Sequence, residues 1–299
     1  MTGVRIGTAE RDSTFLSQGL TLKTVLDREP ALAPVVVSTS AHASIENASR
    51  LHSDDIDFGF MASNWIGRAK NGEAPFAEKI ELRMVAPMNA GPLFFITRFE
   101  SALRTARDLR GRRLVVGPER SGMAQHARVI LGALGLTFDD LMPVFLDFAA
   151  GAQALDHGEV DAQLQCPIPN KVMTALDQGV LLRVLPYAPG DLDAVLGAVP
   201  FYRRTTMHKG AIRALTDDVE QPAVVNVLVT HARVDVGKVG DVTSAIIRAR
   251  RELPRLNPLF AGMEELFAPL RWNSARQVLE FGGVALHRGA SAAYIDAAF

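Results

Sequence analysis

The chain has almost no cysteine and no long hydrophobic run. Its 299 residues include one cysteine, Cys166, so the chain cannot form an internal disulfide or a cysteine-ligated zinc cluster. The seven histidines are scattered without metal-ligand spacing, so we predict no metal site. No stretch of 18 apolar residues occurs, so we expect no segment that inserts into a membrane.

An excess of charge of either sign is also missing. The chain has 32 Lys and Arg against 33 Asp and Glu, which gives a formal net charge of -1. It therefore has no overall basic field for nucleic acid, which we exclude as a partner, and no acidic tail. The remaining composition, 48% hydrophobic and 22% charged, is typical of globular proteins, and the length suffices for two domains.

The start of the chain has no charged segment followed by an apolar core, as a secretory signal would have. Residues 1–3 lead directly into a predicted strand at Val4. We therefore expect a periplasmic protein if a signal peptide has been removed, and a cytoplasmic protein otherwise.

Two ten-residue segments repeat one pattern. LHSDDIDFGF at 51–60 and LDHGEVDAQL at 155–164 both read Leu, a polar turn, an acid, a β-branched residue, Asp and a strand. The elements before them match in order. In the first repeat we expect strands at 4–8 and 35–37 and helices at 14–26 and 44–52. In the second we expect strands at 113–117 and 144–146 and helices at 122–134 and 151–157. We predict a βαβαβ unit over 4–60 and a second over 112–164, each with a parallel sheet. Chance similarity of two generic units is the alternative.

This duplication predicts an α/β protein with two lobes, each a mostly parallel sheet flanked by helices. We assign residues 1–95 and 203–299 to lobe 1 and residues 96–202 to lobe 2. Because ligands bind beyond the carboxyl ends of parallel strands, we expect a ligand cleft between the lobes. Beyond residue 200 we expect a buried strand over 224–229 and helices over 241–252 and 273–279.

Several ordered segments carry a family resemblance. They are Ile6-Gly-Thr8, DDIDFGF at 54–60, DLRGRRLVVGP at 108–118, Ser121-Gly122, GLTFDD at 135–140 and VPFY at 199–202. In this order they resemble the TAXI family of TRAP-transporter solute receptors, which have a type II periplasmic-binding-protein fold. The resemblance implies a solute-binding protein that captures a small organic anion bearing a carboxylate, without a cofactor, for TRAP membrane subunits. The loop at 9–15 is more charged than is usual in this family, and the loop at 38–44 lacks the usual glycines.

Candidate ligand-binding residues lie mostly in loops that follow predicted strands. A helix N-terminus offers free N–H groups and partial positive charge to a carboxylate, and Gly122 permits close approach there. Arg11 is suited to bind a carboxylate with two hydrogen bonds or to pair with Glu10 or Asp12. The predicted ligand-binding residues are Thr8, Arg11, Ser13, Thr14, Ser40, His42, Ser44, Ser63, Trp65, Ser121, Gly122, Met123, Phe148, Gln165, Cys166 and Tyr202.

Several of these residues also have a purely structural interpretation. The serines and Thr14 suit helix caps, Trp65 and Tyr202 suit core packing, and His42 suits the surface. We predict no catalytic residue, because Cys166 has no activating partner in the sequence and no nucleophile elbow, P-loop or zinc signature occurs. Two alternatives to transport stay open on the same fold. One is an enzyme acting on an organic acid (a decarboxylase, tautomerase or hydrolase), and the other is a cytoplasmic ligand sensor.

Overall fold

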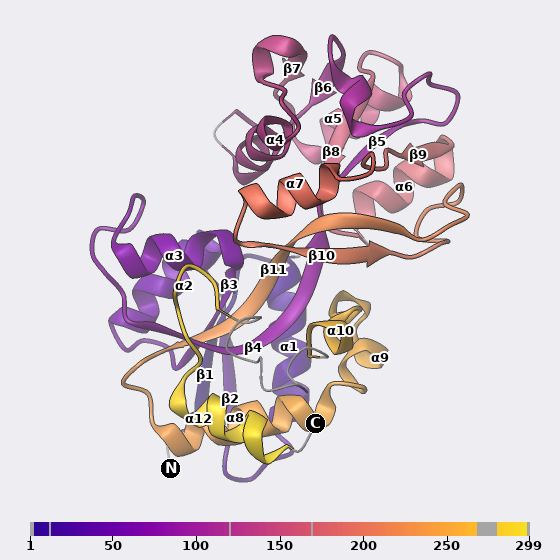
Figure 1. Cartoon of the computed structure of the whole chain (residues 1–299). Coiled ribbons are helices and arrows are strands. Elements are labelled where there is room, and N and C mark those ends of the chain that lie inside the picture. The colour runs from indigo at the N-terminus through magenta and orange to yellow at the C-terminus, as the bar shows by residue number, and fades with distance from the viewer. Residues whose placement is uncertain (1–2, 12, 120, 169, 268–279, 298–299) are drawn as a thin grey trace. The chain divides into compact units, whose positions relative to one another are not determined.

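The computed structural model of the chain describes residues 3–11, 13–119, 121–168, 170–267 and 280–297. The chain divides into two units, shown as a ribbon in Figure 1. Unit 1 consists of residues 1–90 and 225–299, and unit 2 of residues 91–224. Both units combine a β-sheet with helices, which confirms the predicted α/β class.

Unit 1 begins with the predicted alternation of strands and helices. Its first elements are β1 (Val4–Gly7), α1 (Thr14–Leu26), β2 (Val35–Ser38), α2 (Ala43–His52), β3 (Phe58–Ala62), α3 (Ser63–Asn71) and β4 (Leu82–Pro92), which runs on into unit 2. The chain returns through β11 (Val219–His231), α8 (Val236–Ala249), α9 (Leu253–Leu256), a 3-10 turn (Pro258–Phe260), α10 (Met263–Phe267) and α12 (Arg288–Asp296). The helix expected over 241–252 begins earlier, at Val236, because the Asp235 side chain accepts a hydrogen bond from the Lys238 N–H at 2.8 Å. The helix expected over 273–279 lies outside the described residues.

Unit 2 repeats the alternation. Its elements are β5 (Phe94–Arg98), a 3-10 turn (Ala106–Leu109), β6 (Arg113–Val115), α4 (Gly122–Ala133), a 3-10 turn (Phe138–Asp140), β7 (Met142–Val144), α5 (Phe148–Asp156), β8 (Ala162–Gln165), α6 (Lys171–Gly179), β9 (Leu182–Val184), α7 (Asp191–Ala198) and β10 (Tyr202–Met207). The strand expected over 144–146 is wrong by two residues. Val144 pairs with Val115 as the last residue of β7, and Asp147 already caps α5.

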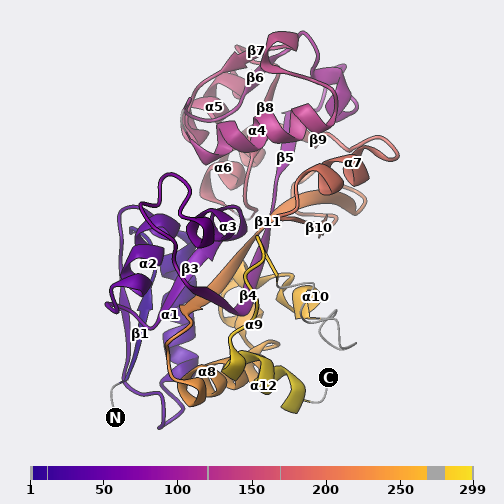
Figure 2. The ribbon, with the colours of Figure 1, turned by 60° about the vertical axis from the view of Figure 1, so that its left-hand side comes forward.

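The two duplicated segments build their sheets in the same strand order. In unit 1, β1 lies between β2 and β3 and is parallel to both, and β11 pairs antiparallel with β3. In unit 2, β6 lies between β7 and β8 and is parallel to both, and β5 pairs antiparallel with β8. Figure 2 shows the same ribbon from a second side. The first strand of each repeat is therefore central, and the carboxyl ends of three parallel strands meet at one edge of each sheet.

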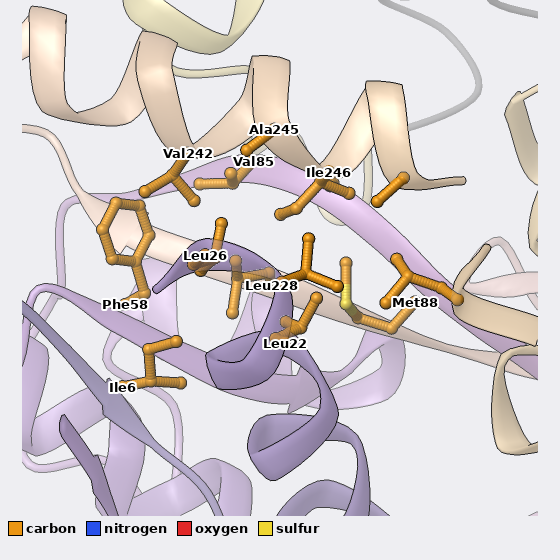
Figure 3. Close-up of a cluster of buried hydrophobic side chains, with 14 of the residues drawn as sticks. Ile6, Leu22, Leu26, Phe58, Val85, Met88, Leu228, Val242, Ala245 and Ile246 are labelled. Atoms are coloured by element: carbon orange, nitrogen blue, oxygen red, sulfur yellow. The ribbon is translucent and has the colours of Figure 1, made fainter. Parts of the chain in front are cut away.

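The core of unit 1 lies between its sheet and the helices α1 and α8. Figure 3 shows α1 and α8 directing apolar side chains toward strand residues. Full burial of one such side chain contributes about 1.5–3 kcal/mol. The labelled residues, all buried, are Ile6, Leu22, Leu26, Phe58, Val85, Met88, Leu228, Val242, Ala245 and Ile246.

Helix α12 packs directly on α8 at a glycine. A Cβ atom added to Gly289 would lie 2.1 Å from the carbonyl oxygen of Val236 and 2.8 Å from the amide nitrogen of Gly240. Both of those atoms belong to the backbone of α8, which cannot move aside like a flexible side chain. Position 289 therefore requires glycine, since only a residue without Cβ lets the two helix backbones come this close.

An aspartate just before the third strand of each repeat holds an arginine of the first strand. The Asp57 carboxylate accepts hydrogen bonds from the backbone N–H, Nε and Nη2 of Arg5 at 2.8, 3.1 and 3.1 Å. The Asp161 carboxylate accepts the same three from Arg113 at 2.8, 3.2 and 2.8 Å. The duplication thus extends to a side-chain pair that fastens the amino ends of two adjacent strands in each unit.

The turn before this aspartate contains a residue with left-handed backbone in both repeats. Asp54 has φ 65° and Gly158, at the equivalent position, has φ 74°. An L-residue in this region costs about 1–2 kcal/mol, less for Asp than for most residues. We expect Asp54→Gly to raise the free energy of unfolding by about 0.5 kcal/mol in urea denaturation, because the exposed Asp54–Arg5 contact that it removes contributes little.

The matched change in unit 2 is Gly158→Ala. It should lower stability by about 1–2 kcal/mol, since the added Cβ would be strained and would meet Nη1 of Arg98 at 2.6 Å. Equal effects of the two substitutions would contradict the backbone argument.

Candidate functional site

One edge of the unit 2 sheet gathers two helix N-termini and the end of a strand. The strands β7, β6 and β8 are parallel neighbours, so their carboxyl ends share this edge. Helix α4 follows β6, helix α5 follows β7, and β8 ends at Gln165. Free N–H groups and the partial positive charge of each helix N-terminus make such an edge suitable for an anion.

The start of α4 is formed by three predicted residues. The Ser121 hydroxyl accepts a hydrogen bond from the Ala124 N–H at 3.2 Å, as an N-cap. Gly122 is the first helical residue, and a Cβ added to it would have no atom within 4 Å. Met123 follows and is half-buried. The first turn of α4 thus has open space beside Gly122, which a larger residue would fill.

The start of α5 is held in the same way. The Asp147 side chain accepts a hydrogen bond from the Ala150 N–H at 2.8 Å. Phe148, the first helical residue, is half-buried, and its carbonyl oxygen accepts a hydrogen bond from Nε2 of Gln163 at 3.1 Å. Strand β8 thereby fixes the N-terminus of α5 through a side-chain amide.

Gln165 ends β8 at the same edge and is fully buried. Neither its amide oxygen nor its amide nitrogen has a hydrogen-bond partner among the described residues. Leaving a buried polar group unpaired costs about 1–3 kcal/mol, so a ligand that pairs with the amide would recover this energy. Sequence reasoning selected Gln165 but missed other buried groups of unit 2 without a partner in the described chain, among them the Tyr187 hydroxyl and the Gln221 amide. No motif marks either of them.

Tyr202 pairs with a histidine that sequence reasoning missed. The Tyr202 hydroxyl lies 2.6 Å from Nδ1 of His126, and both side chains are buried. Burial lowers the pKa of His126 to about 4. Burial, followed by the nearby Tyr187 and Cys166 groups, raises the pKa of Tyr202. Both side chains are neutral at pH 7, and their contact joins α4 to β10. The available sequence signal was the helical spacing from Gly122 to His126, which is too general to select it.

Cys166 follows Gln165 directly. Its Sγ lies 3.7 Å from the carbonyl oxygen of Gly91, and burial raises the pKa of the thiol to about 12. The thiolate, which is the nucleophilic form, is therefore scarce at neutral pH.

The hydroxyl residues predicted in unit 1 bind the backbone of their own unit. The Thr8 hydroxyl donates to the Ser38 carbonyl oxygen at 2.8 Å, and the Ser40 hydroxyl donates to the Thr8 carbonyl oxygen at 2.8 Å. These contacts stabilise the strand-to-helix turns, and a role of these residues in ligand binding stays a prediction. The hydroxyls of Ser13, Ser44 and Ser63 accept hydrogen bonds from the N–H groups of Leu16, Ala62 and Val225 at 3.1, 3.0 and 3.2 Å.

Four further predicted residues of unit 1 differ in how far they are exposed. Arg11 and His42 are exposed, and Thr14 is a half-buried residue at the start of α1. Asp12, a possible partner of Arg11, lies outside the described residues. Trp65 is half-buried, packs edge-on against Phe76 at 6.3 Å between ring centroids, and has the Arg68 guanidinium 5.3 Å from its ring centroid. Its place in a pocket stays a prediction.

The described residues contain neither a cluster of metal ligands nor a helix that could span a membrane. No group of three or more His, Cys, Asp or Glu side chains there is arranged to hold a metal ion. None of the helices in that part of the chain is both long enough and apolar enough to cross a membrane.

A family match covers nearly the whole chain. The model of the NMT1-like family matches residues 6–296. The chain belongs to the NMT1-like family. The finer resemblance to TAXI receptors stays a prediction.

Three solved structures are similar in fold to this NMT1-like chain. The periplasmic sulfonate-binding protein SsuA from Methylobacillus flagellatus KT has a TM-score of 0.57 and 15% identity, covering 89% of this chain and 72% of that chain. A TctC solute binding protein from Polaromonas has a TM-score of 0.57 and 12% identity, covering 88% and 94%. PhnD1 from Prochlorococcus marinus (MIT 9301), in complex with methylphosphonate, has a TM-score of 0.53 and 11% identity, covering 89% and 97%. These similarities confirm the predicted periplasmic-binding-protein-like fold.

Proposed function

We propose that this chain is a solute-binding protein that captures a small organic anion and delivers it to a membrane transporter. Membership of the NMT1-like family and the fold shared with solute-binding proteins support this proposal. The observation that carries it is the buried, unpartnered amide of Gln165 at the edge where α4 and α5 begin. A ligand oxygen accepting from this amide and from helix N–H groups would satisfy donors that otherwise stay unpaired.

The proposed ligand is a small carboxylate. Helix N-termini and amide N–H groups bind oxyanions of several kinds, so sulfonates and phosphonates are the nearest chemical alternatives. Two proteins of similar fold point to those alternatives, because SsuA is named as a sulfonate-binding protein and PhnD1 was solved in complex with methylphosphonate. We propose TRAP membrane subunits as the partner, following the TAXI resemblance, and a periplasmic location. An ABC transporter is the alternative, since the SsuA relative belongs to one.

The proposal is tested by a thermal-shift screen against small carboxylates, sulfonates and phosphonates. A ligand that binds the native state alone raises the melting temperature, and the stabilisation grows with the logarithm of its concentration relative to Kd. Each hit is then incubated with the protein and analysed for products. A stabilising compound that is recovered unchanged supports solute binding, whereas a compound that is consumed shows an enzyme.

The Gly122→Asp variant tests the place of binding. A carboxylate at the first helical residue of α4 would repel an anion there, and we expect the dissociation constant of a confirmed hit to rise at least about tenfold, measured by isothermal titration calorimetry. The fold should be unharmed, because position 122 has open space and an acidic residue suits a helix N-terminus. Gly122→Ala is the matched control and should bind within about twofold of the unaltered protein. Unchanged affinity in Gly122→Asp would place the anion elsewhere.

A further inference from the structure

Three amide side chains meet in unit 1 and form what we call the amide cluster: Gln18 of α1, Asn89 of β4 and Asn226 of β11. Oδ1 of Asn89 accepts a hydrogen bond from Nε2 of Gln18 at 3.1 Å and another from Nδ2 of Asn226 at 3.0 Å. These partners lie 71 and 137 positions from Asn89, so no local sequence pattern marks the cluster.

The orientation of the Asn89 amide is fixed by a backbone carbonyl. Nε2 of Gln18 also donates to the Leu259 carbonyl oxygen at 3.0 Å. A carbonyl oxygen accepts hydrogen bonds and cannot donate them, so the Gln18 amide must turn its nitrogen toward the cluster. Asn89 therefore turns its oxygen toward Gln18, because a reversed amide would set two N–H donors against each other. The Asn89 nitrogen, Nδ2, is left for a different partner.

This nitrogen is an accessible donor on a nearly buried residue. Asn89 as a whole is 4% exposed. Its Nδ2 has no acceptor in the described part of the chain, and it is not one of the fully buried polar atoms that lack a partner. Solvent therefore reaches Nδ2, whereas the unpartnered Oε1 of Gln18 in the same cluster is closed off. The exposed fraction of Asn89 thus includes a donor that is held in one orientation and is not used within the fold.

The amide cluster lies at the carboxyl edge of the parallel strands of unit 1. Asn226 pairs in register with Ala62, the last residue of β3, and β3 is a parallel neighbour of β1. Helix α3 begins at this point, and its N-cap residue Ala62 has no side chain that could accept from the first-turn N–H groups. The Ser63 hydroxyl accepts a hydrogen bond from the Val225 N–H at 3.2 Å, which holds the start of α3 beside β11. An accessible amide donor and an uncapped helix N-terminus therefore occur together at this edge.

We propose that Asn89 is a ligand-binding residue of unit 1, whose Nδ2 donates a hydrogen bond to an oxygen atom of the captured solute. The inference rests on the proposed solute-binding function and adds a residue through which unit 1 recognises the solute. The oxygen belongs to a carboxylate, sulfonate or phosphonate group, since each presents acceptors to an amide N–H and to the first-turn N–H groups of α3. Gln18 and Asn226 are positioning residues that hold the Asn89 amide.

NMR of the side-chain amides tests this contact directly. Acetate, ethanesulfonate and methylphosphonate, the simplest members of the three classes, are each added to ¹⁵N-labelled protein with ionic strength held constant by NaCl. We expect at least one of them to give a saturable shift of the Asn89 amide signals, which are assigned through bonds from its own backbone. The Asn71 amide, which donates to Glu73 at an exposed site of the same unit, is the internal control and should not shift.

Asn89→Asp tests the donor itself. One carboxylate oxygen still accepts from Gln18 and Asn226, and the other takes the place of Nδ2, where it meets solvent and can ionise. The variant loses the donor and repels an anion, so we expect the dissociation constant of the probe that shifts Asn89 to rise at least about tenfold. Asn71→Asp adds the same charge at an exposed position of the unit and should bind within about twofold of the unaltered protein.

The outcomes separate this inference from the proposed function. Normal affinity in Asn89→Asp would overturn the inference, as would a response of the Gly122 backbone signal without a saturable response of the Asn89 amide. Absence of both responses to all three probes would overturn the proposed binding of small anions as well. If Asn89→Asp does not fold, the amide shift in the unaltered protein decides the question, because it requires no substitution.

Discussion

Replacing Asp57 by alanine is expected to lower the free energy of unfolding by about 3 kcal/mol. The Asp57 side chain is only 7% exposed and holds Arg5 through three hydrogen bonds, with Nζ of Lys238 3.4 Å away. Alanine removes the acceptor of the Arg5 backbone N–H. It also leaves the cations of Arg5 and Lys238 beside an apolar side chain. Urea denaturation at pH 7 measures the loss.

The same carboxylate makes stability depend on pH. Burial alone would raise the pKa of Asp57, but hydrogen bonds from Arg5 and the charges of Lys238 and Arg5 outweigh it and lower the pKa below 3.8. A group whose pKa is depressed by folding contributes fully above its unfolded pKa and loses that contribution as the pH falls through the folded pKa. The stability difference between the unaltered protein and Asp57→Ala should therefore shrink below about pH 3.8. A difference that stays constant down to pH 2 would refute the ion pair as its source.

Asp161→Ala is the matched change in unit 2. The hydrogen bond from Arg113 lowers the pKa of Asp161, in the same direction as for Asp57. Its side chain is 26% exposed, so water can replace part of what is lost, and we expect a smaller effect of about 2 kcal/mol. A larger loss for Asp161→Ala than for Asp57→Ala would show that burial does not control the effect.

Gly289→Ala is expected to lower the free energy of unfolding by about 3 kcal/mol. The added methyl group would lie 2.1 Å from the Val236 carbonyl oxygen, so α12 must move away from α8. That movement disturbs buried residues on both helices, including Val239 and Ala290. Thermal and urea unfolding should both register the loss.

Gly240→Ala provides the control on the facing helix. A Cβ there would lie 3.5 Å from the Gly289 carbonyl oxygen, an ordinary contact distance. Alanine is also favoured over glycine inside a helix by about 1 kcal/mol. Gly240→Ala should be neutral or stabilising. Equal destabilisation by both substitutions would contradict the close approach of position 289 to the α8 backbone.

Sequence alone predicted the architecture because the duplication carries it. The pattern around Asp57 and Asp161 predicted the third strand of each repeat. The alternation of strands and helices before it predicted parallel pairing, which the sheets confirm. The partners of these aspartates were not predicted. Arg5 and Arg113 lie 52 and 48 residues away, and no local pattern joins residues at such separations.

The candidate site was predicted less fully, for a related reason. Ser121 and Gly122 were recognisable because a cap and a glycine are local signals. Whether a hydroxyl such as that of Ser40 faces a ligand or a backbone carbonyl depends on the turn in three dimensions. Likewise, Gln165 gains its meaning only when its amide is seen to have no partner in the described chain.

The division of the chain into two units affects the order in which they can fold during synthesis on the ribosome. Unit 1 starts first, but its strand β3 acquires its β11 neighbour only when residues 226–230 have emerged. All of unit 2 precedes these residues, so its strands are complete while the first 90 residues still lack the part of β11 that pairs with β3. Domains tend to fold as units during synthesis. The inserted unit is therefore the one positioned to fold first, although the chain begins with the other.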